Sequence, residues 1–186
     1  TTTAFLKDLP GLTEVVLGQG DSPEVASFTV HPEVLTSRQV MALSRRAEPL
    51  VEFAANRLSP YDVASFADAR HGSLWLRFRV RGRMQQGALL AAGGLGREQL
   101  VVTVGPEGIT YAGVSRTGVR REVKAAGAWS DGGWHEVVVS VGHGAVELYV
   151  DGFRETHAPG EFFLAGVEGL DEIVVGQDCE GVRLSG

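Results

Sequence analysis

Arginine and tryptophan side chains alternate with apolar ones along residues 73–81. The polar and aromatic set is Trp75, Arg77, Arg79 and Arg81, and the apolar set is Leu74, Leu76, Phe78 and Val80. A period of two predicts a β-strand with its arginines on one face. Guanidinium groups bind carboxylates and an aromatic ring stacks on a sugar, so this face fits an acidic glycan. The alternative is a solvated face whose arginines pair with Glu136 or Glu147 on neighbouring strands.

Acidic residues near the C-terminal end form a second candidate cluster. They are Asp171, Glu172, Asp178 and Glu180. Their oxygens suit calcium, but their spacing matches no ordered ligand set, so we expect no cofactor and keep calcium as the alternative. Glycoside hydrolysis needs a pair of carboxylates, and the sequence has no E-x-D-x-x-E string that would place them along one strand.

The histidines differ in their predicted surroundings. We expect His135 to be structural at a strand start and His143 to lie in a solvated turn. His31, His71 and His157 border predicted strand ends, where the loops of a sandwich gather, so each keeps a functional alternative.

Length and composition limit the classes of protein. With 186 residues the chain fits a single domain, which we divide into an N-terminal extension over 1–58 and a main portion over 59–186. A net charge of -6 with scattered basic residues argues against a nucleic-acid partner. No apolar run reaches the ~20 residues that span a bilayer, and no signal-peptide pattern precedes Phe5. The single cysteine, Cys179, excludes an internal disulfide and is expected to be a small filler residue.

Glycine content and turn signals predict a mostly β protein of short strands. Besides residues 73–81, strands are predicted at 25–30, 88–92, 100–104, 109–114, 119–124, 135–141 and 146–150. Shorter candidates are 13–17, 50–54, 173–175 and 182–184. Gly142-His143-Gly144 and Asp151-Gly152 suit tight turns, so we expect two consecutive hairpins.

Helix signals are confined to the N-terminal third of the chain. Thr36-Ser37-Arg38-Gln39 has the form of a capping box, and Pro49 follows a run with apolar residues at helical spacing. These signals predict a helix over 37–48. A second short helix or turn is predicted over 60–69.

The segment with the two hairpins resembles a known family signature. Residues 134–141, which begin Trp-His-Glu-Val, and residues 146–152, which end Leu-Tyr-Val-Asp-Gly, are similar to the WHxV…LYVDG hairpin of laminin-G-like and related concanavalin A-like domains. Residues 68–78 resemble the start of the first long strand in sialidase-associated lectin modules. The resemblance covers about residues 59–184 and implies a two-sheet antiparallel jelly-roll sandwich, with Trp134 in its core.

The resemblance also implies site residues. Sialic-acid-binding modules of the resembling type use arginine and tyrosine on strands of one sheet. Tyr111 and Arg116 lie in the similar region, and they join Trp75, Arg77 and Arg79 as candidate ligand-binding residues. The closing strand of the family pattern is missing, so we expect residues 13–30 or 50–54 to cover the open sheet edge.

The leading functional prediction is a non-catalytic carbohydrate-binding or adhesion-type domain with a glycan or other small-molecule ligand and without membrane insertion. One alternative is a bacterial cyclase, lyase or hydrolase that uses the concave face of the same sandwich, and another is a protein-interaction domain. A shallow groove with aromatics and arginines would favour the lectin, and a deep apolar cavity the enzyme. A lectin would be secreted or at the cell surface, an enzyme cytoplasmic.

Overall fold

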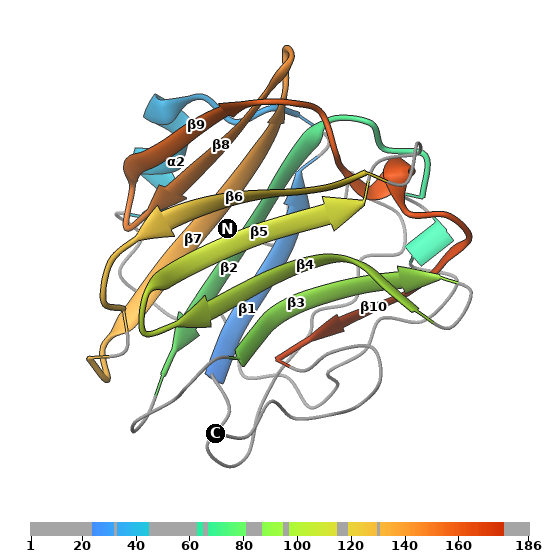
Figure 1. Cartoon of the computed structure of the whole chain (residues 1–186). Coiled ribbons are helices and arrows are strands. Elements are labelled where there is room, and N and C mark those ends of the chain that lie inside the picture. The colour runs from blue at the N-terminus through green and yellow to red at the C-terminus, as the bar shows by residue number, and fades with distance from the viewer. Residues whose placement is uncertain are drawn as a thin grey trace.

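The protein is a two-layer β-sandwich in the computed structural model (Figure 1). The structure describes residues 24–31, 33–44, 63–64, 67–80, 87–94, 97–114, 119–129 and 131–176. In that part of the chain, ten strands form two antiparallel sheets of five strands each. The mostly β, jelly-roll fold predicted from the sequence is therefore confirmed.

Sheet A holds the first long strand and both hairpins. Its strands run in the order β1 (Glu24–His31), β2 (Gly72–Arg79), β7 (Trp134–Gly142), β8 (Ala145–Val150) and β9 (Phe153–Pro159). Sheet B runs in the order β10 (Leu170–Val175), β3 (Gly87–Gly94), β4 (Arg97–Gly105), β5 (Gly108–Val114) and β6 (Arg120–Ala126). A short 3-10 helix, η1 (Leu164–Gly166), precedes β10.

The core lies between the two sheets and follows the alternation seen in the sequence. In β2, Leu74, Leu76 and Phe78 are fully buried. Sheet B supplies the facing layer, for example Leu100 and Ile109. Each such side chain stabilises the fold by roughly 1.5–3 kcal/mol through removal of apolar surface from water. Since neighbouring residues of β2 point to opposite faces, this burial turns Trp75, Arg77 and Arg79 to the outer face of sheet A.

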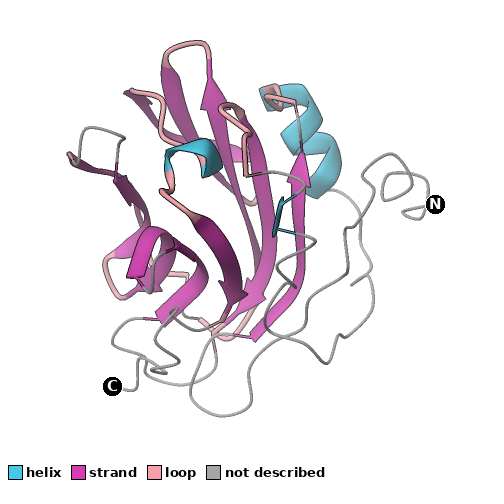
Figure 2. Ribbon diagram, turned by 90° about the vertical axis from the view of Figure 1, so that its right-hand side faces the viewer, coloured by secondary structure: helices cyan, strands magenta, loops and turns pink. Residues whose placement is uncertain are grey.

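Helix α2 (Ser37–Ser44) begins at the predicted capping box. The backbone N–H of Thr36 donates to Oε1 of Gln39 at 2.9 Å, and the backbone N–H of Gln39 lies 3.4 Å from Oγ1 of Thr36. These two contacts satisfy N–H groups that have no partner inside the helix. The helix lies outside the strands in Figure 2. Its predicted continuation over 45–48 falls outside the described residues.

Left-handed backbone conformations close the hairpin between β8 and β9. Asp151 has φ 51° and Gly152 has φ 84°, as a two-residue turn with both central residues at positive φ requires. The two predicted hairpins are confirmed, because β7 pairs with β8 and β8 pairs with β9. Strand β9 was not predicted, because most of its residues are polar and it ends on a proline.

The N-terminal segment supplies the strand that was expected at an open edge. β1 pairs antiparallel with β2, with Val30 opposite Leu74 and His31 opposite Ser73. β10 begins at Leu170, three residues earlier than the predicted strand over 173–175. The candidate strands at 13–17, 50–54 and 182–184 fall outside the described residues.

Candidate functional site

Helix α2 covers part of the outer face of sheet A. Leu35 and Val40 pack there on Trp75 of β2, Val138 of β7 and Tyr149 of β8. Only 8% of Trp75 is exposed. The predicted role of Trp75 as a stacking surface for a sugar is therefore corrected, because α2 and the preceding segment occupy the space above its ring.

The uncovered part of this face carries an exposed tryptophan in contact with two arginines. The guanidinium carbon of Arg79 lies 4.6 Å from the centroid of the Trp134 ring, and that of Arg77 lies 5.7 Å from it. Trp134 is 37% exposed, and both arginines are half-buried. We call Arg77, Arg79 and Trp134 the arginine–tryptophan surface.

The exposure of Trp134 corrects the expectation that its ring lies in the core. Trp134 opposes Arg79 in the β2–β7 register, so the two side chains share one face. The core residues of β7 are Val137, Val139 and Val141. Trp134 is an odd number of residues away from each of these valines. Because side chains alternate between the two faces of a strand, Trp134 faces outward. The alternation of side chains along residues 134–141 predicts an outward-facing Trp134 from the sequence alone. The resemblance to the family hairpin predicted the opposite.

The side chains of this surface are of the types that bind a carboxylate attached to a sugar. Two guanidinium groups bring two positive charges, and Glu136, which opposes Arg77 in register, brings one negative charge on the same face. A guanidinium donates paired hydrogen bonds to a carboxylate, and the tryptophan ring offers an apolar surface to a sugar ring.

Tyr111 and Arg116 do not join this surface in the structure. Tyr111 lies on β5 of sheet B, is fully buried, and donates a hydrogen bond from its hydroxyl to the carbonyl oxygen of Phe162 at 2.6 Å. Its ring also stacks on the Phe162 ring, with centroids 4.9 Å apart. Burial raises the pKa of Tyr111, so its hydroxyl stays protonated. The predicted ligand-binding role of Tyr111 is corrected to a core role, and Arg116 falls outside the described residues.

A histidine held between two carboxylates lies directly next to Trp134 in sequence. Nδ1 of His135 lies 2.8 Å from Asp151, and Nε2 lies 3.0 Å from Asp131. Asp151 also accepts the backbone N–H of Glu136 at 2.8 Å. The hydrogen bond to Asp151 is the main cause that raises the pKa of His135, and Asp131 adds to it. The expected structural role of His135 fits these contacts.

A second polar cluster centres on Glu147 of β8. Its carboxylate accepts hydrogen bonds from the Tyr149 hydroxyl at 2.6 Å and from Arg154 at 3.0 Å, and His157 lies 3.2 Å away. Burial acts to raise the pKa of Glu147, but these hydrogen bonds outweigh it and hold the pKa below its ordinary value. The Tyr149 hydroxyl lies 3.1 Å from Oγ of Ser37, so the cluster connects α2 to sheet A.

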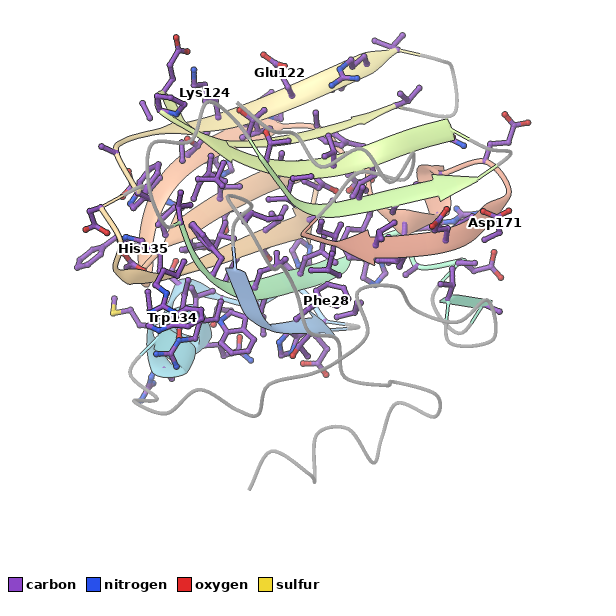
Figure 3. All side chains as sticks on the ribbon, turned by 90° about the horizontal axis from the view of Figure 1, so that it is seen from below. Phe28, Glu122, Lys124, Trp134, His135 and Asp171 are labelled. Carbon is purple, nitrogen blue, oxygen red and sulfur yellow. The ribbon has the colours of Figure 1, made fainter. Side chains whose placement is uncertain are left out.

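Two of the four acidic residues considered for calcium are described, and they lie in sheet B, away from the arginine–tryptophan surface on sheet A. Asp171 and Glu172 belong to β10 rather than to a loop, and Asp178 and Glu180 fall outside the described residues. Figure 3 places Asp171 on the opposite side of the view from Trp134. Within the described ranges, no group of three or more histidine, cysteine, aspartate or glutamate side chains is arranged to hold a metal ion. None of the helices described is long and apolar enough to span a membrane.

Comparison with known proteins identifies the fold. No family model matches the sequence, and a comparison with curated proteins finds no match. The carbohydrate-binding module CBM40 of the Ruminococcus gnavus IT-sialidase is similar in structure, with a TM-score of 0.61 and 12% identity over 94% of this chain and 85% of that chain. The same module bound to α2,3-sialyllactose also has a TM-score of 0.61 and 12% identity, over 94% of this chain and 84% of that chain. Mouse laminin α1 domains LG4-5 match with a TM-score of 0.44 and 15% identity, over 60% of this chain and 30% of that chain. The two CBM40 structures confirm the predicted two-sheet jelly-roll sandwich at the level of the fold.

Proposed function

We propose that this protein is a carbohydrate-binding module that binds an acidic glycan on the arginine–tryptophan surface. The observation that carries the proposal is the placement of Arg77 and Arg79 against the exposed ring of Trp134. Similarity in fold to a module bound to α2,3-sialyllactose supports a glycan as the ligand. Fold alone does not determine function, so the proposal depends on the chemistry of these three side chains.

The two kinds of side chain have different tasks in this proposal. The Trp134 ring stacks on the apolar face of a sugar, which gives affinity without regard to charge. The guanidinium groups of Arg77 and Arg79 donate hydrogen bonds to the carboxylate of the glycan, which gives selectivity for acidic sugars. The contact between the arginines and the ring holds the guanidinium groups beside the stacking surface and so reduces the entropy lost on binding.

Calorimetric titration with 3′-sialyllactose and with lactose tests the proposal. Wild type should bind the acidic sugar and bind lactose much more weakly. Arg77→Ala should weaken binding of sialyllactose by about 1.5–3 kcal/mol, the scale of a hydrogen bond to a charged group, and should leave the fold intact because this side chain faces outward.

Arg120→Ala is the matched control, because Arg120 is exposed on β6 of the other sheet. It should bind sialyllactose like wild type. Equal affinity for both sugars, or equal binding by wild type and Arg77→Ala, would remove the arginine–tryptophan surface from the binding site.

A further inference from the structure

The His135 ring makes contacts that require both of its nitrogens to carry a proton. Each ring nitrogen faces a carboxylate oxygen, Asp151 at 2.8 Å and Asp131 at 3.0 Å. A carboxylate only accepts hydrogen bonds, and a neutral imidazole has a single N–H to donate. Both contacts are hydrogen bonds only while the ring is an imidazolium. Loss of its proton must therefore break one of the two.

The two carboxylates are not equally fixed. Each carboxylate accepts one backbone N–H besides the ring: Asp151 accepts that of Glu136, which lies inside strand β7, whereas Asp131 accepts that of Gly133 in its own exposed segment, so Asp151 has the firmer second anchor. The Asp131 side chain is 62% exposed, against 43% for Asp151. Its contact with His135 is also the longer of the two. Deprotonation should therefore release Asp131 and keep Asp151.

Asp131 shapes the segment that leads directly into Trp134. Its Oδ1 accepts the backbone N–H of Gly133 at 2.6 Å as well as facing Nε2 of His135. Gly132, which lies between Asp131 and Gly133, has φ 88°, in the left-handed region that favours glycine. The protonated histidine thus ties residues 131–133 to the start of β7, and these residues position the backbone of Trp134.

We propose that protonated His135 is a positioning residue for Trp134, so that ligand binding on the arginine–tryptophan surface weakens as the ring loses its proton. The part that concerns binding rests on the proposed function. The part that concerns the position of Trp134 does not, and it can be tested without a ligand.

The groups packed around His135 set the pH range of this effect. Asp151 and Asp131 are the charged groups that face the ring, and from β2 the ring meets Phe78, with centroids 5.8 Å apart. Arg79 and Glu136 are close in sequence or register but belong to the outer face of sheet A. Both facing charges are negative, and they hold the pKa of His135 above its ordinary value of 6.5. The transition therefore falls on the alkaline side of that value.

Nuclear magnetic resonance of the ligand-free protein tests the positional part. The His135 ring protons and the Trp134 indole N–H are followed between about pH 6 and about pH 9, with the indole signal assigned from Trp134→Phe. The His135 signals and the Trp134 indole signal should change with the same midpoint pH. In Asp131→Asn, which keeps an acceptor oxygen but removes the charge, both midpoints should move to lower pH. An indole signal that does not follow His135, or an unchanged midpoint in Asp131→Asn, would overturn the proposal.

The control for that variant is Asp171→Asn, the same substitution at an exposed residue of β10. It should titrate like wild type, and a shift equal to that of Asp131→Asn would show a general charge effect and contradict a specific role of Asp131.

Titration with 3′-sialyllactose over the same pH range tests the binding part. Wild-type affinity should fall roughly fivefold from the acidic to the alkaline end, the lower end of usual coupling between two sites. If the Trp134 indole signal follows the titration of His135 but the affinity for 3′-sialyllactose does not change with pH, the proposed link between the position of Trp134 and binding is overturned. If the sugar does not bind at any pH, the proposed function fails, and the resonance experiment alone decides whether His135 positions Trp134.

Discussion

Acidification should destabilise this protein through one buried histidine, His31 of β1. Only 4% of His31 is exposed, and burial lowers its pKa from 6.5 to about 4. The folded state therefore holds the ring neutral at a pH where the unfolded chain takes up a proton. Stability falls as the pH drops from about 6.5 to about 4, because only the unfolded state gains a proton in that range.

The size of the loss follows from the two pKa values. The difference between 6.5 and about 4 corresponds to about 3 kcal/mol, since one pKa unit is worth about 1.4 kcal/mol. Glu107 and Glu147, with pKa values lowered from 4.5, contribute stability that is lost only at the acid end of this range and below it. His135, with its raised pKa, contributes stability that is complete below pH 6.5 and is lost above it. Asp131 and Asp151, with lowered pKa values, contribute stability that is lost only below about pH 3.8.

Urea denaturation followed by tryptophan fluorescence measures this loss between about pH 7 and about pH 4. Wild type should lose about 3 kcal/mol of unfolding free energy over that range. His31→Gln, which does not titrate there, should start less stable and lose far less. His71→Gln, at an exposed histidine, should follow wild type. An equal loss in wild type and His31→Gln would refute the assignment of the acid sensitivity to His31.

Three further substitutions test which aromatic rings are buried in the core and which are exposed. Tyr111→Phe should cost about 1–3 kcal/mol in urea denaturation, because it leaves the buried carbonyl of Phe162 without its donor; a neutral effect would show that this hydrogen bond is not made. Phe78→Ala should cost about 3–5 kcal/mol as a core truncation, whereas Trp134→Ala should cost only about 1–2 kcal/mol for its two contacts with arginine. Similar losses of unfolding free energy in Phe78→Ala and Trp134→Ala would indicate that the Trp134 ring is part of the core.

The strands and turns could be predicted because their causes are local. The alternation of residues 73–81 identified β2 and assigned Leu74 and Phe78 to the core, as the structure confirms. Asp151-Gly152 marked a turn that needs positive φ, and both residues have it. The capping box located the start of α2. In each case, the physical requirement is met by residues within one strand, one turn or one helical turn.

The candidate site could be predicted only in part, because it depends on which elements cover which face. Alternation turned Trp75 and Arg77 to the same side of β2, but only the packing of α2 distinguishes a covered Trp75 from an uncovered Arg77. Tyr111 resembled a ligand contact, and only the stacking of sheet B on sheet A shows that it faces inward.

By itself, the sequence determined a sandwich of short antiparallel strands with an arginine-bearing outer face, because period-two patterns and turn residues act over a few positions. Only the tertiary structure decided that Trp134, rather than Trp75, is the open aromatic ring beside Arg77 and Arg79. Residues 79 and 134 are far apart in the chain, and the β2–β7 register that makes them neighbours is fixed by the burial of both strands in a common core.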